Sequence, residues 1–522
     1  MRAIMHVVNR EGLAELAQEL QSQQVTIYAA DETLKVLSSE KIRAAPLSEL
    51  TKFPEILDGG AGVLHPAIVG AILARRGDKR HEANLKAHGI APIDIVVANL
   101  SSSAERTASP AATLDEVLAC VDVGALSLIQ AAASNFQDVL VLVRPQDYAP
   151  VMQEWREQGE VSMETRRRLA IAALQHIASY DSALIEYLRM SGGELFPDEL
   201  TLSLKRKQIL RYGENPHQRA ALYRWGGMTA STPLPTVAGA DLLHGRDLSF
   251  NNLLDLDVAL ATVQSFTAPT IVIVKHTNPC GLACDDVLVE AYRKAHAGDP
   301  ISASGGIIGS NRPIDEATAH EICQLFYEAV IAPEFTPQAL SLLRQKEALR
   351  LLATHRPIEP RMLNTQLLLS ARPEVRSISG GLLLQTPDIV GEREAEYSVV
   401  TEREPTLDEV TDLMFAWKVV RRVKSNAIVL ARKLTLLGVG AGQMSRATSV
   451  QLALEKAGTR ARGSVMASDA SFPFPDGIEA AARAGITAII QPGGSPRDEE
   501  AIRVANRHAL AMIFTGRRHF RH

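Results

Sequence analysis

The sequence predicts an α/β protein with more than one domain. Short apolar runs alternate with amphipathic stretches along nearly the whole chain, a pattern typical of sheets covered by helices. The segment Ile486–Phe514 shows the pattern compactly: an apolar run, the turn Pro492–Gly494, an amphipathic stretch and a second apolar run. The chain has 522 residues, more than one hydrophobic core usually organises.

Each element is predicted from its local pattern, in chain order. A first strand is expected within Met1–Glu11. The clearest later strands are short apolar runs bounded by turn residues: Ile93–Leu100, Asp138–Val143, Thr270–Val274, Thr487–Gln491 and Ala511–Phe514. The clearest helices are longer stretches with apolar residues at helical spacing: Thr113–Cys120, Thr165–Arg189, Asp408–Arg422 and Arg497–His508.

A domain boundary is expected between about Gly192 and Lys207. The long helical stretch ends at Ser191–Gly193, and Pro197 and a basic tripeptide follow it. We therefore expect one domain over residues 1–200 and a second region over residues 201–522.

Charge and cysteine content narrow the class of protein. The chain carries 55 basic and 60 acidic residues, so no global field favours nucleic acid or an anionic membrane as a partner. No apolar run reaches about 18 residues, and no transmembrane helix is expected. With only four cysteines, a reducing cytoplasm is a better expectation than a disulfide framework.

The segment Val274–Gly281 places Lys275 and His276 at the end of a predicted strand. Ligand sites of α/β proteins lie at the carboxyl ends of strands. There a histidine can act as a base near neutral pH, and a lysine can hold an anion or polarise a carbonyl. From spacing alone, a polar strand end with solvated side chains is the more common outcome.

Four further segments combine turn formers with polar or aromatic side chains: Arg211–Gln218, Gly438–Arg446, Ser468–Gly477 and Phe514–His522. The glycine-rich segment Gly438–Arg446 can present backbone N–H groups to an anion, and Arg446 can bind the anion through two hydrogen bonds. It is neither a dinucleotide-binding fingerprint nor a Walker loop. Ordinary surface loops and a solvated tail are the alternatives for these segments.

Together these segments resemble the bifunctional purine biosynthesis family that joins a phosphoribosyl-aminoimidazole-carboxamide (AICAR) formyltransferase to an inosinate (IMP) cyclohydrolase. The matching strings occur in the family's order: LRYGENPHQ, NNLLDLD, VKHTNPCG, SGG, VIAPEF, SGGLL, FAWKVVRRVKSNAIV, GAGQMSR, SDA with FPFPDG, and TGRRHFRH. They run from about residue 205 to the end, and the ordered set is far more specific than any one string. The resemblance also extends through the first 200 residues.

The resemblance implies a fold and a reaction. The fold is an N-terminal methylglyoxal-synthase-like, Rossmann-type domain followed by two cytidine-deaminase-like α/β units. The reaction is transfer of a formyl group from 10-formyltetrahydrofolate to the 5-amino group of AICAR, without a catalytic metal. The zinc signature of true deaminases is absent, which argues against a zinc-dependent deaminase.

The resemblance also assigns residues. His276 would deprotonate the weakly nucleophilic amine, Lys275 would stabilise developing charge or aid protonation of the leaving group, and Asn426 would orient the substrate. The residues expected to contact the nucleotide or the folate are Arg211, Tyr212, Gly305, Ser445, Arg446, Phe472, Pro473, Asp476, Arg518 and Phe520. The resemblance leaves two alternatives open for Val420, Val423, Ser425 and Asp469: binding of a potassium ion, or a structural role without an ion. It also implies that the chain forms a homodimer.

Two residues depart from the family pattern in the formyltransferase region. Ser304 and Ser471 stand where the family usually has phenylalanine. An aromatic ring contributes stacking of order 1 kcal/mol. We therefore expect altered affinity for the folate, while the Lys-His pair is retained.

The first 200 residues keep the apolar framework of the family's cyclohydrolase but not its polar positions. The changed segments are His6–Gly12, Tyr28–Thr33, Gly59–Pro66, Asn99–Ser103, Asp122–Leu126 and Ala131–Asn135. Asp31 and Glu32 stand where a phosphate would bind, and they would repel it. We expect IMP cyclohydrolase activity to be lost. A fully bifunctional enzyme and a non-catalytic nucleotide-binding homologue are the alternatives.

Overall fold

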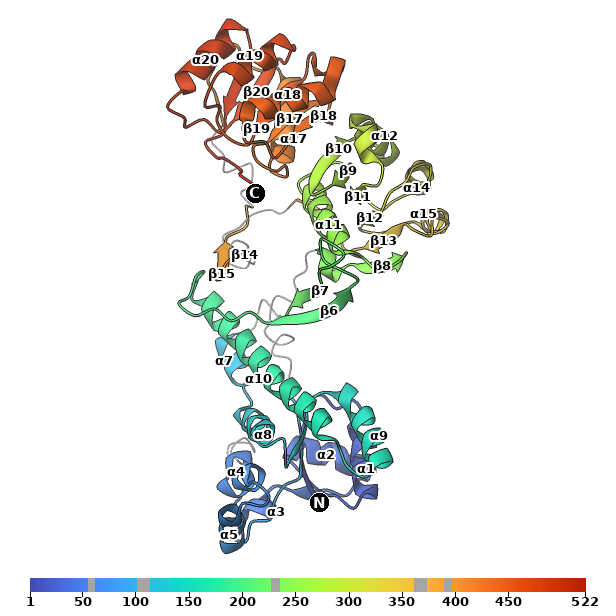
Figure 1. Cartoon of the computed structure of the whole chain (residues 1–522), viewed down its shortest axis with the longest axis vertical. Helices are drawn as coiled ribbons and strands as arrows, with labels where there is room; N and C mark the ends of the chain where they lie inside the picture. Colours follow the sequence, from blue (N-terminus) through green and yellow to red (C-terminus); the bar gives the residue numbers. More distant parts are fainter. Residues whose placement is uncertain (55–61, 101–112, 227–234, 361–372, 389–396) are drawn as a thin grey trace. The chain divides into compact units, whose positions relative to one another are not determined.

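A computed structural model describes residues 1–54, 62–100, 113–226, 235–360, 373–388 and 397–522. The chain divides into two compact units, which we describe separately (Figure 1). Unit 1 is Met1–Lys205 with a short segment that begins at Arg224. Unit 2 is Arg206–Tyr223 with the remainder of the chain to His522.

Unit 1 is built on a five-stranded parallel sheet with the strand order β3-β2-β1-β4-β5. The strands are β1 (Arg2–His6), β2 (Thr26–Ala29), β3 (Ala45–Pro46), β4 (Ile95–Ala98) and β5 (Leu140–Leu142). The helices are α1 (Leu13–Ser22), α2 (Asp31–Ser39), α3 (Ser48–Thr51), α4 (Pro66–Leu73), α5 (Lys79–Ala87), α7 (Leu114–Leu118), α8 (Val123–Ser134), α9 (Tyr148–Gln158) and α10 (Met163–Ser191).

Helices cover both faces of this sheet because alternate side chains of its buried strands point to opposite sides. Ala3 and Met5 of β1 pack on the face that is covered mainly by α1 and α9. Ile4 packs on the other face, which α4, α8 and part of α10 cover. The stretch Leu114–Ser134 is long and apolar enough to span a membrane, but here it forms α7 and α8, and α8 lies in this second core.

Unit 2 is built on one mixed sheet of twelve strands, in the order β16-β21-β20-β19-β17-β18-β10-β9-β11-β12-β13-β8. Its first half contains β8 (Asp241–His244), β9 (Thr270–Lys275), β10 (Asn278–Cys284), β11 (Ile307–Ser310), β12 (Ala329–Ala332) and β13 (Arg350–Ala353). Its second half contains β16 (Ser398–Val399), β17 (Ile428–Arg432), β18 (Thr435–Gly440), β19 (Val465–Ser468), β20 (Ala488–Gln491) and β21 (Ala511–Phe514).

The two halves of the sheet repeat one topology. Counted outward from the central pair β10 and β18, each half places its strands in the same order of appearance along the chain: third, second, fourth, fifth, sixth and first. The two central strands pair antiparallel at Ala283 and Thr435, which fits a two-fold relation between the halves. Two separate ribbons accompany the sheet, β6 (Leu204–Leu210) with β7 (Ala220–Trp225) and β14 (Glu374–Ile378) with β15 (Gly381–Gln385).

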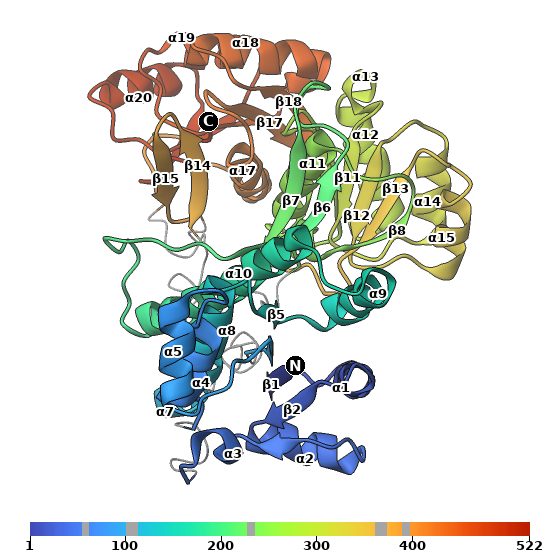
Figure 2. The same ribbon diagram turned by 60° about the horizontal axis from the view of Figure 1, so that its bottom comes forward.

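The helices of unit 2 follow the same repeat. Helices α11 (Phe250–Val263) and α17 (Leu407–Val420) share one core on one face of the sheet. On the other face, the first half packs α12 (Leu288–Gly298), α13 (Pro300–Ala303), α14 (Glu316–Cys323) and α15 (Pro337–Leu343). The second half packs α18 (Arg446–Ala457), α19 (Asp476–Arg483) and α20 (Asp498–Arg507), which lie together in Figure 2.

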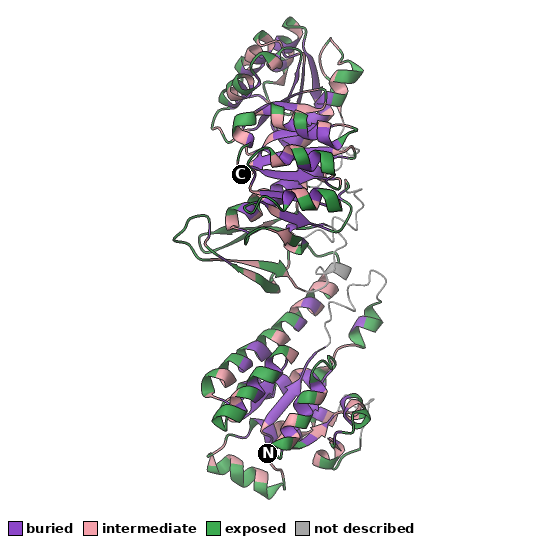
Figure 3. Cartoon of the chain, turned by 90° about the vertical axis from the view of Figure 1, so that its right-hand side faces the viewer, coloured by how far each residue is buried: buried purple, intermediate pink, exposed green. Residues whose placement is uncertain are grey.

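Burial follows the layers, with buried strands between helices whose outer sides are exposed (Figure 3). All the strands and helices predicted from local pattern are present, with ends shifted by a few residues. The α/β class with a methylglyoxal-synthase-like N-terminal domain is confirmed. The cytidine-deaminase-like character of the two halves stays a prediction.

Candidate active site

The Lys275–His276 pair lies on a tight turn between β9 and β10. Lys275 is the last residue of β9, and His276 and Thr277 both adopt left-handed backbone conformations, with φ of 53° and 60°. Such conformations are unfavourable for residues other than glycine. The carboxylate of Asp255, on α11, accepts the N–H groups of Thr277 at 2.6 Å and of His276 at 3.3 Å, and so holds the turn.

The Lys275 side chain reaches the loop before β11. Its Nζ donates a hydrogen bond to the backbone oxygen of Ser304 at 2.7 Å. The next residue, Gly305, has a φ of 75° and donates its N–H to the oxygen of Phe326 at 2.8 Å. The predicted substrate-contacting Gly305 is therefore beside Lys275, and its left-handed backbone accounts for the glycine.

A segment from the second half of unit 2 contacts the strand that follows this turn. The side-chain oxygen of Asn278 accepts the N–H of Lys424 at 3.0 Å, and its amide nitrogen donates to the oxygen of His276 at 3.0 Å. Asn278 thus connects the Lys275–His276 turn to the segment that contains Asn426.

Around Asn426 lies a buried polar cluster. The guanidinium of Arg446 donates to the carboxylate of Asp469, to the hydroxyl of Ser468 at 2.7 Å and to the side-chain oxygen of Asn426 at 2.8 Å. The side chains of Arg446 and Asp469 are only 5% and 0% exposed. Ser425 donates its hydroxyl to the second oxygen of Asp469 at 2.5 Å. Arg446 therefore forms an internal ion pair and orients Asn426, and its contact with the nucleotide stays a prediction.

The C-terminal tail runs along this cluster. The backbone of Arg521 exchanges two hydrogen bonds with Ser425, one to its hydroxyl at 3.0 Å and one from its N–H at 2.9 Å. The guanidinium of Arg518 lies 4.6 Å from the ring centre of Phe520, and both side chains are exposed. Burial lowers the pKa of Lys424 and of Arg521, and neighbouring cations add to the effect for Lys424. Lys424 and Arg521 thus place two partly buried cationic groups at this end of the cluster.

A cavity of about 220 Å³ opens between the two halves at this edge. Its lining includes Lys275, His276 and Asn278 from the first half and Lys456 from α18. Lys456 is held by Asp299 at 2.6 Å. Burial raises the pKa of Cys280, also in the lining, to about 12, so its thiol is not a nucleophile at neutral pH.

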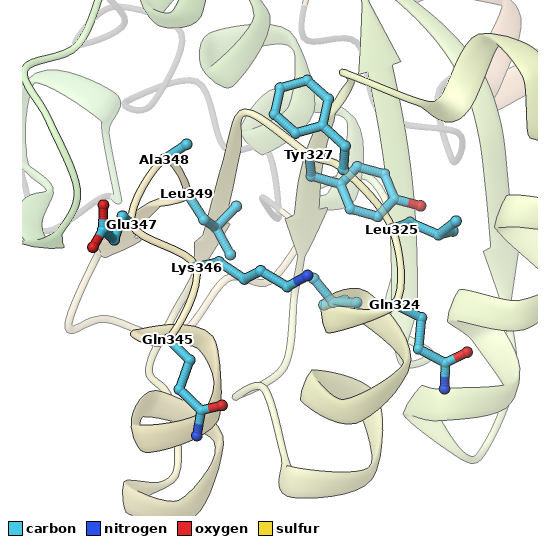
Figure 4. Close-up of a pocket in the computed structure, with 10 residues that line it drawn as sticks. Gln324, Leu325, Tyr327, Gln345, Lys346, Glu347, Ala348 and Leu349 are labelled. Carbon is cyan, nitrogen blue, oxygen red and sulfur yellow. The ribbon is translucent and has the colours of Figure 1, made fainter.

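A larger cavity, of about 450 Å³, lies beside the loop after α14 and the loop before β13 (Figure 4). Its lining includes Phe326, Tyr327 and Lys346 but neither Lys275 nor His276. The smaller cavity is the candidate active site, because its lining includes the ammonium group of Lys275 and the imidazole of His276.

One predicted contact residue is buried in this structure, and its contact with a ligand stays a prediction. Phe472, expected on the wall of the site, is only 2% exposed and belongs to the core between the sheet and α18–α20. Gly477 makes room for its ring, since a Cβ there would lie 3.1 Å from it. The exposed aromatic side chain of this loop is Phe474, stacked under Arg497 at 4.6 Å.

The other predicted contacts lie at the surface. Pro473 and Asp476 are exposed at the start of α19, and Ser445 is exposed at the start of α18. Arg211 lies 5.8 Å from the ring of Tyr212 in the loop after β6. In the part of the chain that the structure describes, no hydrogen bond or ion pair connects this pair to the Lys275 turn.

Sequence reasoning missed three residues that shape the site. Asp255 accepts a backbone N–H group of the Lys275–His276 turn. The side-chain amide of Asn252 donates a hydrogen bond at 2.8 Å to the carboxylate of Glu328, just before β12. Asn252 and Asp255 are three residues apart and therefore share one side of α11. The string NNLLDLD contains this signal, since it puts polar residues at helical spacing on an otherwise apolar helix.

The changed positions of unit 1 form contacts of their own. His6, at the end of β1, lies 2.5 Å from Asp122, which caps α8. Glu32 pairs with Lys35 at 2.6 Å and approaches Arg10 at 3.7 Å. Residues 59–61 and 101–103 lie outside the described residues, so their predicted changes have no structural account.

These features define a class of protein: a two-unit α/β protein with an amine and an imidazole at a strand end, in the lining of a cavity. The family model described as "AICARFT/IMPCHase bienzyme" matches residues 132–456, and the "MGS-like domain" model matches residues 12–127. The bifunctional purine biosynthesis protein PurH of Anoxybacillus flavithermus is 46% identical over 521 residues, which covers 100% of this chain and 99% of that protein.

The PurH protein of Bacillus cereus strain 03BB102 is 44% identical over the same length and with the same coverage. A solved structure titled "Crystal structure of ForH" aligns with 36% of this chain and 98% of its own, at 26% identity and a TM-score of 0.33. The chain belongs to the PurH family of bifunctional AICAR formyltransferase/IMP cyclohydrolase proteins.

Proposed function

We propose that unit 2 transfers a formyl group from 10-formyltetrahydrofolate to the 5-amino group of AICAR. The main support for this proposal is that Lys275 and His276 line a cavity to which residues of the second half of unit 2 also contribute. Membership in a family named for this activity supports it. The cations Lys424, Arg518 and Arg521 along the tail suit the phosphate of the nucleotide.

The chemistry follows from the two side chains. The amine nitrogen attacks the formyl carbon while His276, which is exposed to the cavity, accepts the proton of the amine. The new carbon–nitrogen bond forms as the bond from the formyl carbon to N10 of the folate breaks, and a proton is delivered to N10. Lys275 stabilises the negative charge that develops on the formyl oxygen. The position of Asn426, fixed by Arg446, suits it to orient the formyl group.

The predicted potassium site does not fit the contacts at its only carboxylate. Arg446 and Ser425 already occupy the two oxygens of Asp469, so its charge is neutralised by the guanidinium. Val420 and Val423 are both fully buried, and the oxygen of Val420 accepts the N–H of Val423. We therefore assign no step to a potassium ion, and its presence stays a prediction.

A steady-state assay tests the proposal. Purified protein is given AICAR and 10-formyltetrahydrofolate, and the formylated nucleotide is measured. Turnover that saturates in both substrates is expected, with a raised KM for the folate because Ser304 and Ser471 lack the usual rings. Protein that binds AICAR but forms no formylated product would identify a non-catalytic homologue.

We further propose that unit 1 does not close the purine ring. Ring closure needs an anchored phosphate and stabilisation of charge at the reacting amide. The carboxylates of Asp31 and Glu32 lie at the start of α2, where they disfavour a phosphate, and Asp122 is engaged by His6. The relatives are named bifunctional, the matching family model is described as a bienzyme, and the identity runs along the whole chain, so full bifunctionality is the alternative.

A separate assay decides between these alternatives. The protein is supplied with the formylated nucleotide alone, and inosinate is measured against the uncatalysed background. We expect no acceleration above that background. Saturable formation of inosinate would show that unit 1 retains cyclohydrolase activity despite its changed residues.

A further inference from the structure

We propose that Asp255 is a positioning residue for formyl transfer, because it holds the backbone that presents Lys275 and His276. This inference rests on the proposed function of unit 2. Among the described residues, the hydrogen bonds of Asp255 to this turn go to backbone N–H groups and not to the side chains of Lys275 or His276. Asp255 acts through the turn, by accepting the N–H groups of His276 and Thr277.

The turn needs such a partner. Two consecutive non-glycine residues with positive φ store strain of order 1 kcal/mol each. The carboxylate offsets this strain with two charge-assisted hydrogen bonds, one from each N–H to a different oxygen. Burial raises the pKa of Asp255, and the N–H groups of Thr277 and His276 act in the opposite direction. The two bonds therefore favour the charged form of the group.

The internal repeat of unit 2 supplies a natural control. Asp412, on α17, occupies the matching place and accepts the N–H groups of Lys433 and Leu434, both at 2.8 Å. These two residues have φ of 52° and 53°, so the turn between β17 and β18 is built in the same way. The same arrangement therefore stabilises both turns: a carboxylate on a helix accepts two consecutive backbone N–H groups.

Only one of the two turns lies at the cavity. The N–H of Cys284, at the end of β10, donates to the oxygen of Leu434 at 3.0 Å, while His276 precedes the start of β10. Seven residues of β10 therefore separate the two turns by about 20 Å. Loss of the Asp412 contacts should affect folding of unit 2 but not the geometry of the catalytic pair.

The test compares Asp255→Asn with Asp412→Asn in the full-length protein. Each substitution keeps the shape of the side chain but removes its negative charge. It also replaces one of the two acceptor oxygens with an NH2 group, which cannot accept a backbone N–H. We expect Asp255→Asn to lower kcat at least about tenfold, with the KM for AICAR within about twofold, because a small displacement of catalytic groups is costly. Asp412→Asn should leave kcat within about twofold, and Asp255→Glu should recover part of the lost kcat.

Amide hydrogen exchange provides a readout that does not depend on activity. Exchange should rise at residues 276–277 in Asp255→Asn and at residues 433–434 in Asp412→Asn. Equal loss of kcat in both variants, or unchanged kcat and exchange in Asp255→Asn, would overturn the inference. If the wild-type protein shows no formyl transfer, the proposed function fails and the positioning role fails with it, and exchange confined to residues 276–277 would show only that Asp255 holds the turn.

Discussion

At the scale of single residues, the buried ion pair of Arg446 and Asp469 is the centre of the polar cluster around Asn426. Both side chains are almost fully buried, and both oxygens of the carboxylate have partners. A buried charge that loses its partner is strongly destabilising, whereas the intact pair adds little stability beyond an apolar pair. We therefore expect this pair to specify the orientation of Asn426 rather than to add much net stability.

Arg446→Met tests this expectation. The substitution leaves Asp469 buried and unpaired, so the free energy of unfolding should fall by about 3–5 kcal/mol in equilibrium urea denaturation. The double variant Arg446→Met with Asp469→Asn should recover much of the loss, because no uncompensated charge remains. A single variant within about 0.5 kcal/mol of the wild type would contradict the burial argument.

The roles of the predicted site residues stay predictions, but local backbone features explain where three of them lie. Lys275 ends a buried strand, His276 follows it in the turn, and Gly305 has a left-handed backbone. The burial of Phe472 could not be predicted, because two aromatic residues share one loop and packing beside Gly477 determines which ring is buried. Asp255 was missed because its function depends on a turn 21 residues away.

At the scale of elements, the start of α17 shows how one helix end is stabilised. Glu409 completes a capping box with Thr406 and pairs with Arg403, whose two guanidinium nitrogens lie at 2.8 and 3.0 Å from its oxygens. Burial raises the pKa of Glu409, but the hydrogen bonds from Arg403 and others outweigh it and lower the pKa from 4.5 to about 2.

This shift predicts a pH dependence of stability. A carboxyl whose folded-state pKa is depressed stabilises the fold above its unfolded pKa, and the contribution is lost as the pH falls through the folded value. Glu409→Gln should therefore lower the free energy of unfolding by at most roughly 3 kcal/mol at pH 7. The difference from the wild type should shrink below about pH 4.5, toward pH 2. A difference that is independent of pH from 7 to 3 would argue against the ion pair.

Elements were more predictable than their arrangement. Apolar runs and amphipathic periods located the strands and helices because both signals are local. The two-fold repeat of unit 2 could not be seen in this way, since the two halves share topology and hydrogen bonds rather than residue strings. His276 and Thr277 in one half correspond to Lys433 and Leu434 in the other. The strand order and the equivalent contacts of Asp255 and Asp412 identify these positions as equivalent.

At the scale of the whole molecule, we expect the chain to form a homodimer, as the family resemblance implies. One observation beside the site fits this expectation. Met444 is 96% exposed, and its backbone oxygen accepts a hydrogen bond from the side chain of Asn426. A large apolar side chain in that position favours burial by a second copy of the chain.

Sedimentation checks the assembly. The wild type should sediment as a species of twice 56.6 kDa, and Met444→Glu should shift the equilibrium toward the monomer by placing a charge in the contact. Ser445→Ala, at the next position, is a matched control that leaves the apolar surface intact. A wild-type protein that is monomeric and fully active would contradict the expected dimer.

The central claim is that His276 removes the amine proton during formyl transfer in unit 2. The most direct measurement compares wild type and His276→Ala under saturating AICAR and 10-formyltetrahydrofolate, with AICAR binding measured separately by calorimetry. We predict that kcat falls at least about 100-fold while the Kd for AICAR changes by less than about threefold, because a base contributes to the transition state rather than to binding. A variant that keeps most of the wild-type kcat would remove His276 from the mechanism and contradict this account.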